Sequence, residues 1–155
     1  MTFRISGIDS TPFEHLFGLA DADLAHHHAK RYVADEKPGY PCRVSLEDAE
    51  PSETLLLLNY RHHTAPTAYA AEGPIFVRER RARHAELIDE VPDQLKARLI
   101  SLRAYDRDGM MIDADVVDGK ELKSLIERFL ANGEASYLHA HFARRGCYAA
   151  RIERR

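Results

Sequence analysis

Cysteine is scarce in this sequence, and long apolar runs are absent. Only two cysteines, Cys42 and Cys147, occur among 155 residues. A chain of this length can bury enough apolar surface to be stable without disulfides, so we expect both cysteines to be free thiols in a reducing compartment. No stretch of eighteen apolar residues is present, and residues 1–7 lack the apolar stretch of a signal peptide. We therefore predict a cytoplasmic protein without a membrane segment.

Several motifs of well-known enzyme and binding classes are also missing. The chain has no glycine-rich phosphate loop, no Gly-x-Ser-x-Gly, no His-Glu-x-x-His and no Cys-x-x-Cys. The classes that depend on these motifs are therefore not expected. The formal net charge of -3 argues against the broad positive field that nonspecific nucleic-acid binding needs, so nucleic acid is not an expected partner.

The composition is that of an ordinary globular protein. Apolar residues make up 45% of the chain and charged residues 30%. No internal repeat or low-complexity segment divides the sequence, and its length is typical of one domain. We predict a single domain over residues 1–155.

One segment has the pattern of an amphipathic helix. Its apolar residues recur at the spacing of one helical face, and they are Leu122, Leu125, Ile126, Phe129 and Leu130. Asp118 and Glu121 have the spacing of a capping box at the start of this segment. We predict one long helix over about residues 119–131 and a short N-terminal helix that begins at Thr11.

Most of the remaining chain is predicted to form strands. The clearest signal is a hairpin in which residues 98–106 and 110–117 flank the three-residue loop Arg107-Asp108-Gly109. A second hairpin is expected around Arg144-Arg145. The other expected strands are residues 3–8, 43–46, 54–60, which suits a central strand, and 74–78. The predicted fold class is therefore α+β, with a largely antiparallel sheet.

The second hairpin carries the strongest candidate site. His139 and His141 are two residues apart on a strand, so their side chains project from the same face and can share a metal ion. Cys147 lies on the opposite face if Arg144-Arg145 is a two-residue turn, and on the histidine face if the loop is one residue longer. A third metal ligand is expected, with no preference among the candidates, from His62, His63, Cys42, Glu79, Asp113 or Asp115.

Further candidates lie outside this hairpin. Cys42 is a candidate nucleophile because Pro41 restricts its backbone and Arg43 can lower the pKa of a neighbouring thiol. The other candidate catalytic residues are His139, His141 and Cys147. Polar side chains near strand ends are candidates for binding an anionic ligand, and they are Arg43, Tyr60, His62, Arg78 and Arg103.

Several sequence blocks together resemble those of a family of uncharacterised bacterial proteins of about this length. The blocks include Tyr40-Pro41-Cys42-Arg43, Gly73-Pro74-Ile75-Phe76-Val77-Arg78-Glu79, and His139-Ala140-His141 followed by Gly146-Cys147-Tyr148. The family pattern has an asparagine where this chain has Phe142. The resemblance covers almost the whole chain, and it implies a single-domain bacterial protein without implying an activity, a cofactor or a substrate.

Three functional hypotheses follow from these residues. The first is a site for a small, anionic molecule, with or without catalysis, in which His139 and His141 converge with Arg103, Arg78 and either Tyr60 or His62. The second is a metal-dependent enzyme in which His139 and His141 bind a divalent transition metal and activate a water molecule. The third is a non-enzymatic module that forms a homodimer through a sheet edge or an apolar patch.

Overall fold

The computed structural model describes residues 2–155, which form nine strands and five short helices. In chain order the elements are β1 (Phe3–Ser6), the 3-10 helix η1 (Thr11–Leu16), α1 (Asp21–His26), β2 (Lys30–Val33), β3 (Thr54–His63), β4 (Ala71–Arg78), β5 (Glu86–Ile88), α2 (Asp93–Lys96), β6 (Leu99–Tyr105), β7 (Met111–Asp118), the 3-10 helix η2 (Gly119–Glu121), α3 (Leu122–Leu130), β8 (Tyr137–Phe142) and β9 (Tyr148–Arg154).

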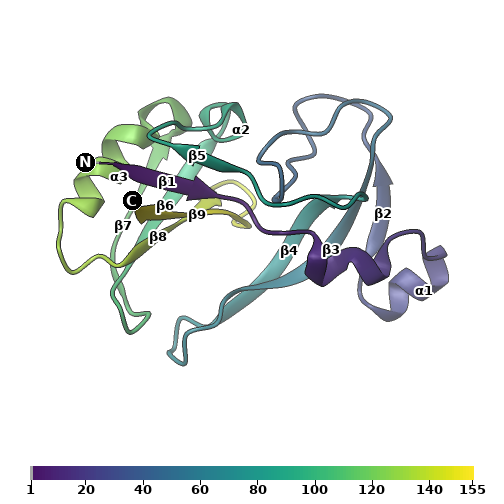
Figure 1. Cartoon of the computed structure of the whole chain (residues 1–155), viewed down its shortest axis with the longest axis horizontal. Coiled ribbons are helices and arrows are strands. Elements are labelled where there is room, and N and C mark those ends of the chain that lie inside the picture. Colours follow the sequence, from purple (N-terminus) through teal and green to yellow (C-terminus); the bar gives the residue numbers. More distant parts are fainter. Residues whose placement is uncertain (1) are drawn as a thin grey trace.

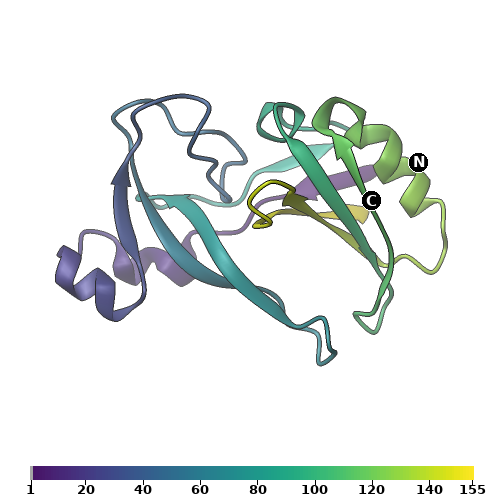
Figure 2. The ribbon, with the colours of Figure 1, turned by 180° about the vertical axis from the view of Figure 1, so that it is seen from behind.

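The strands form two separate antiparallel sheets. The larger sheet has the order β5-β1-β9-β8-β6-β7, and the smaller has the order β2-β3-β4. In Figure 1 the two sheets lie side by side, with α2 and α3 at the larger sheet and α1 at the smaller one. Figure 2 shows the same division from behind, with the β3–β4 and β6–β7 hairpins extending in the same direction.

The expected fold class is wrong. The part of the chain that the structure describes is mostly β, with two sheets in place of one, and it contains no long helix. The segment expected as a helix over about residues 119–131 is a three-residue 3-10 turn followed by the nine-residue α3. The expected N-terminal helix is the six-residue 3-10 helix η1. The expected strand at residues 43–46 is also absent, and the neighbouring residues Pro41 and Cys42 form only isolated bridges.

Close packing at Gly119 explains why the helix is short. The backbone of Gly119 lies so near α2 that an added Cβ would be 1.8 Å from the carbonyl oxygen of Leu95. Its N–H donates to the carbonyl oxygen of Arg98 at 2.8 Å. This contact holds the end of β7 and the following turn against α2, so regular α-helix begins only at Leu122.

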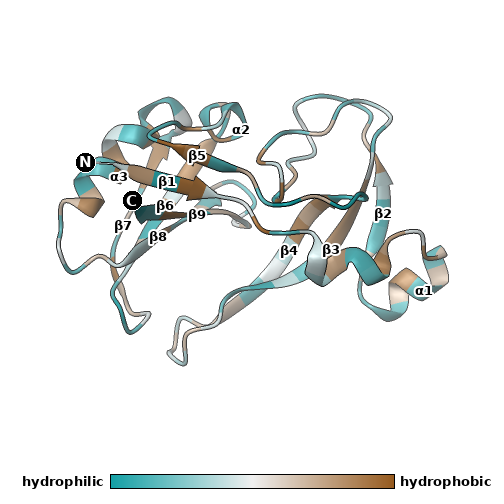
Figure 3. Ribbon diagram, viewed as in Figure 1, coloured by the Kyte–Doolittle hydropathy of each residue, from teal (hydrophilic) through white to brown (hydrophobic). Residues whose placement is uncertain are grey.

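Three buried apolar clusters within residues 2–155 stabilise the two sheets, and two of them contain most of the buried residues. In the larger one, the apolar face of α3 packs on residues such as Leu102, Leu138 and Ala140 from one face of the six-stranded sheet. In the smaller one, η1 and α1 contribute Phe13 and Leu24 against β3 and β4. Figure 3 shows that β3 and β4 become more hydrophilic toward their shared hairpin end, beyond this apolar region.

No helix within residues 2–155 is long and apolar enough to cross a membrane.

Candidate functional site: a three-histidine cluster between the sheets

The end of β3 brings two consecutive histidines to the larger sheet. The pairing of β3 with β4 shifts between Tyr60 and His63, which marks a β-bulge. A bulge adds an unpaired residue and re-aims the side chains around it. His62 and His63 both contact His139 on β8, with ring centroids 6.2 Å and 5.4 Å away. The bulge is therefore the local feature that turns two neighbouring residues toward one site.

The face of β8 opposite α3 supplies the other two histidines. Leu138, Ala140 and Phe142 lie in the core with α3. Alternation along the strand then places His139 and His141 on the other face, where both are only 1% exposed. The ring of His141 is 5.0 Å from that of His62. The two-residue spacing and the bulge together assemble four histidines from two sheets, and three of them, His62, His139 and His141, form one cluster.

Ring nitrogens of His62, His139 and His141 are close enough to contact one ion after a small movement. One nitrogen from each residue lies within 4.8 Å of the other two. In a tetrahedral site with metal–nitrogen distances of about 2.0–2.1 Å, ligand nitrogens are about 3.4 Å apart. The three rings must therefore approach one another by up to about 1.4 Å, which small rotations about side-chain bonds can provide.

The hydrogen bonds of these rings leave several nitrogens without a protein partner. Six buried side-chain atoms within residues 2–155 have no hydrogen-bond partner, and two of them are Nδ1 of His62 and Nδ1 of His139. Nδ1 of His141 is 2.9 Å from the carbonyl oxygen of Gly146. A carbonyl oxygen only accepts, so this Nδ1 donates and the lone pair of His141 is on Nε2.

His63 differs from His62 and His139 because both of its nitrogens have hydrogen-bond partners. Nδ1 donates to the carbonyl oxygen of Tyr69 at 3.0 Å, so Nε2 accepts from the Tyr137 hydroxyl at 2.6 Å. Its ring also stacks on Tyr105, with centroids 4.2 Å apart. His63 therefore holds the two sheets together, whereas His62 keeps a nitrogen available.

Burial keeps the histidines of the cluster neutral. Desolvation is the main cause that lowers the pKa of His139 to about 2 and the pKa of His141 to about 4, and it also lowers the pKa of His62. Tyr148 stacks on the ring of His62, with centroids 5.3 Å apart and planes at 7°, and burial raises the pKa of Tyr148. Neutral imidazoles present the lone pairs that metal ions bind.

Two arginines border the cluster on the strands that flank β8. His139 is the cross-strand partner of Arg103 on β6 and of Arg151 on β9. Nη1 of Arg103 is 3.4 Å from Nε2 of His141. Arg151 lies over the ring of Tyr137 and is bonded to Glu153. Of the five residues expected to bind an anion, Arg103 and His62 are at the cluster, and Tyr60 is at its edge, 5.9 Å from the ring of Tyr148.

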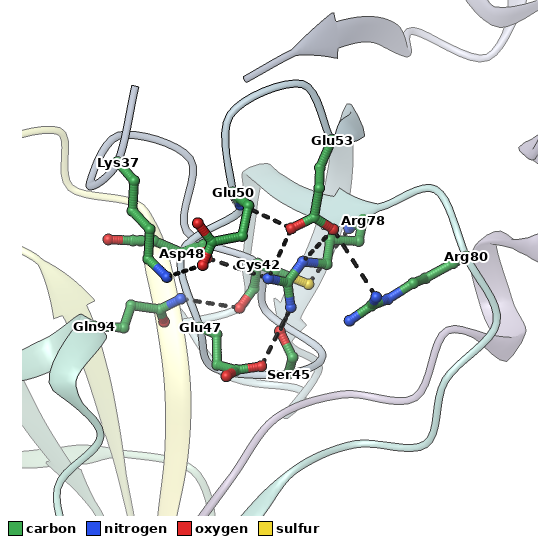
Figure 4. A network of polar contacts seen from close by, with 10 residues as sticks. All are labelled: Lys37, Cys42, Ser45, Glu47, Asp48, Glu50, Glu53, Arg78, Arg80 and Gln94. Atoms are coloured by element: carbon green, nitrogen blue, oxygen red, sulfur yellow. Dashed lines mark hydrogen bonds and ion pairs between the residues drawn. The ribbon is translucent and has the colours of Figure 1, made fainter. Parts of the chain in front are cut away.

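Arg78 lies in a different environment from the histidines. Its guanidinium contacts Ser45 at 2.8 Å, Glu47 at 3.3 Å and Glu53 at 3.2 Å (Figure 4). Cys42 belongs to this region, because its sulfur accepts from the backbone N–H of Arg78 at 3.4 Å. The structure therefore does not bring Arg78 and Cys42 together with the histidines.

Cys147 lies on the face of β8 that carries Phe142, opposite the histidines. Its carbonyl oxygen accepts from the N–H of Phe142, and its side chain packs against the core under α3. Its sulfur is 3.0 Å from Nη2 of Arg43, a buried residue that also donates to the carbonyl oxygen of Tyr148. Cys147 and Arg43 thus form a separate pair behind the histidine face.

Sequence reasoning did not identify Tyr137 and Tyr148 as residues that enclose the cluster, and it linked Tyr105 only with Arg103, as a pair on one face that could orient an anionic ligand. Tyr137, Tyr148 and Tyr105 all contact its rings. A usable signal existed for Tyr148, since the hairpin register pairs it directly with His141. For Tyr105 the partner His63 comes from the other sheet, and no local spacing indicates that contact.

Comparison with known proteins places this site within a family. No curated protein and no solved structure matches the chain. The histidines and arginines of the cluster all lie between residues 39 and 154, the part of the chain that matches a family model. The expected relationship to an uncharacterised family is confirmed. That model is described as "Protein of unknown function (DUF1203)", and the chain belongs to this family.

Proposed function

We propose that His62, His139 and His141 bind one divalent transition metal ion and that this centre is the functional site. The observation that carries the proposal is the pair of buried, unpartnered Nδ1 atoms on His62 and His139, next to a His141 whose tautomer puts its lone pair on Nε2. Buried polar atoms in native proteins nearly always have a partner. A metal ion supplies one partner for several nitrogens at once.

The ligand set favours particular metals. Imidazole nitrogens suit zinc, iron, copper and nickel, whereas calcium and magnesium prefer oxygen ligands. Ring nitrogens from three residues meet here, and no cysteine, aspartate or glutamate within residues 2–155 joins them. Zinc or iron(II) is therefore the preferred occupant.

The number of ligands supports a catalytic role over a structural one. Structural zinc sites usually have four protein ligands, whereas catalytic sites have three and keep a position for water or substrate. A metal ion in such a site lowers the pKa of a bound water or polarises a substrate oxygen. His62 is only partly buried, so the remaining position is approached from its side. We therefore propose a metal-dependent enzyme.

Zinc titration of the chelator-treated, tag-free full chain tests the proposal. We expect one equivalent of tightly bound zinc in the unaltered protein. In His62→Ala, zinc affinity should fall by at least about 100-fold, because loss of a direct ligand exceeds the 10- to 100-fold typical of outer residues. His62 is the suitable position because it is the least buried of the three.

His27→Ala is the matched control. His27 is exposed in the run His26-His27-His28, where it represents weak surface binding of metal. Its replacement should leave the tight equivalent unchanged. Equal loss of zinc in both variants, or no tight zinc in the unaltered chain together with no thermal stabilisation by iron, nickel or copper, would contradict the proposal.

A further inference from the structure

The environment of Arg103 indicates the kind of ligand that the histidine site accepts. Arg103 is half-buried on the histidine face of the larger sheet and is the cross-strand neighbour of His139. Its side chain contacts Ser101 at 3.4 Å and His141 at 3.4 Å, and it also donates to the hydroxyl of Tyr105. None of the ion pairs within residues 2–155 includes Arg103. The guanidinium therefore lies beside the cluster with its charge unmatched by a carboxylate from that part of the chain.

Arg151, on the other side of His139, has its charge matched. It is bonded to the carboxylate of Glu153 and lies 4.2 Å from the centre of the Tyr137 ring. The two arginines occupy equivalent register positions on the strands that flank β8. Of the two, only Arg103 lacks a carboxylate partner among the residues that the structure describes.

The charge of the loaded site favours an anionic ligand. Imidazole binds a metal ion in its neutral form, so a dication held by three imidazoles next to the Arg103 guanidinium gives three positive charges, and no carboxylate from residues 2–155 joins the cluster. Charges removed from water are stable only when they are paired or hydrogen-bonded. A neutral water ligand leaves this excess unchanged. An anionic ligand with two or more oxygens can contact the metal and the guanidinium together.

We propose that the substrate or ligand of this centre is a small oxyanion, of the carboxylate or phosphate class, which bridges the metal ion and Arg103. The proposal rests on the metal site proposed above. Arg103 is a specificity residue in this scheme, because its planar fork matches two oxygens of one oxyanion. No covalent bond of the oxyanion or of the protein is formed or broken in this binding step.

The contact between Arg103 and His141 makes the two proposals separable. Nη1 of Arg103 now lies near the Nε2 lone pair of His141, which is the atom that the metal needs. Removal of the guanidinium eliminates a competitor and a like charge next to the ion. Arg103→Met should therefore bind zinc or cobalt at least as tightly as the unaltered protein, while it loses affinity for the oxyanion.

Cobalt(II)-loaded full chain provides the measurement. Its visible absorption spectrum is followed while acetate, inorganic phosphate or chloride is added at constant ionic strength. In the unaltered protein we expect saturable changes with acetate or phosphate. Arg103→Met should weaken oxyanion binding by about 10- to 100-fold, the loss expected when charge-assisted hydrogen bonds are removed. Chloride is a single atom and cannot accept two parallel hydrogen bonds from the guanidinium on two separate oxygens, so it should change the spectrum much less.

Two further variants sharpen the interpretation. Arg103→Lys keeps the charge but loses the fork, so it should restore only part of the oxyanion affinity. Arg151→Met is the matched control, because Arg151 occupies the equivalent register position but already contacts Glu153. It should bind oxyanions within about threefold of the unaltered protein, since an exposed charge contributes little.

The outcomes distinguish the two proposals. If cobalt binds normally and acetate and phosphate affinities are the same in the unaltered protein and in Arg103→Met, the oxyanion proposal is wrong and the metal site stands. The oxyanion proposal is also wrong if Arg151→Met loses as much affinity as Arg103→Met. If neither cobalt nor zinc binds to the unaltered chain and iron, nickel and copper give no thermal stabilisation, both proposals are overturned.

Discussion

Acid should destabilise this protein well before its carboxylates are protonated. The pKa of His139 is lowered to about 2 and that of His141 to about 4, mainly by burial. In the unfolded chain a histidine titrates near about 6.5. At about pH 5 the two side chains are therefore protonated in the unfolded state and neutral in the folded state. The unfolded state binds more protons, so the free energy of unfolding decreases as the pH falls.

The magnitude follows from the separation of the pKa values. The part of the free energy of unfolding that depends on neutral His139 and His141 is fully present above about pH 6.5. It is lost progressively down to about pH 4 for His141 and about pH 2 for His139. Each pKa unit corresponds to about 1.4 kcal/mol, so at about pH 5 each histidine has cost the folded state about 2 kcal/mol. The pair together removes about 4 kcal/mol, a large part of a typical stability of about 5–15 kcal/mol.

Urea denaturation at about pH 7.5 and about pH 5, with a chelator present, measures this difference. The interval lies above the usual pKa values of aspartate and glutamate, about 3.9 and 4.3, so the histidines dominate. His139→Gln should lose about 2 kcal/mol of the pH dependence. His84→Ala is a control of opposite sign, because hydrogen bonds to Glu86 and Asp9 raise the pKa of His84. Its removal should make the loss of stability at acid pH steeper.

Two results would refute the reasoning. One is an unaltered protein whose free energy of unfolding changes by less than about 1 kcal/mol between the two pH values. The other is a native protein in which the ring protons of His139 or His141 shift with protonation between those pH values, as measured by NMR. The second measurement needs no variant, so it holds even if His139→Gln does not fold.

Two further predictions concern the contacts that hold the sheets together. Tyr137→Phe removes the hydroxyl that donates to Nε2 of His63 at 2.6 Å and leaves a buried nitrogen unpaired. The free energy of unfolding should therefore fall by about 1–3 kcal/mol in chemical denaturation. An unchanged value would show that this bond does not stabilise the contact between the sheets. Gly109→Ala places a Cβ 2.2 Å from that of Ala65, at a φ of 85°, and should lower the free energy of unfolding by at least about 1–2 kcal/mol. Gly133→Ala, where a Cβ meets nothing within 4 Å, should be nearly neutral in the same assay. Equal effects of the two substitutions would contradict the close approach at Gly109.

Local patterns in the sequence were sufficient for several individual elements. The β6–β7 hairpin around Gly109 is present as the spacing predicts. The common face of His139 and His141 also follows from spacing alone, because successive side chains alternate along any strand. These features depend on residues close together in the chain, and their geometry is set by the backbone itself.

The fold class and the composition of the site depended on distant contacts. Hydrophobic alternation marks a strand but does not state its partner, so it could not show that β2, β3 and β4 form a second sheet. Packing of Gly119 against α2 shortened a helix whose apolar spacing was regular. Propensity is a weak influence compared with such tertiary contacts.

The sequence by itself determined that two histidines share one face of a strand, and only the tertiary structure decided what meets them there. His62 reaches them through a bulge at the end of a strand in the other sheet, about 77 residues earlier in the chain than His139. Arg103 lies beside them because β6 pairs with β8, whereas Arg78 and Cys147 are directed elsewhere by their own packing. Spacing along a strand is a local property, but the approach of two sheets is set by how their cores pack.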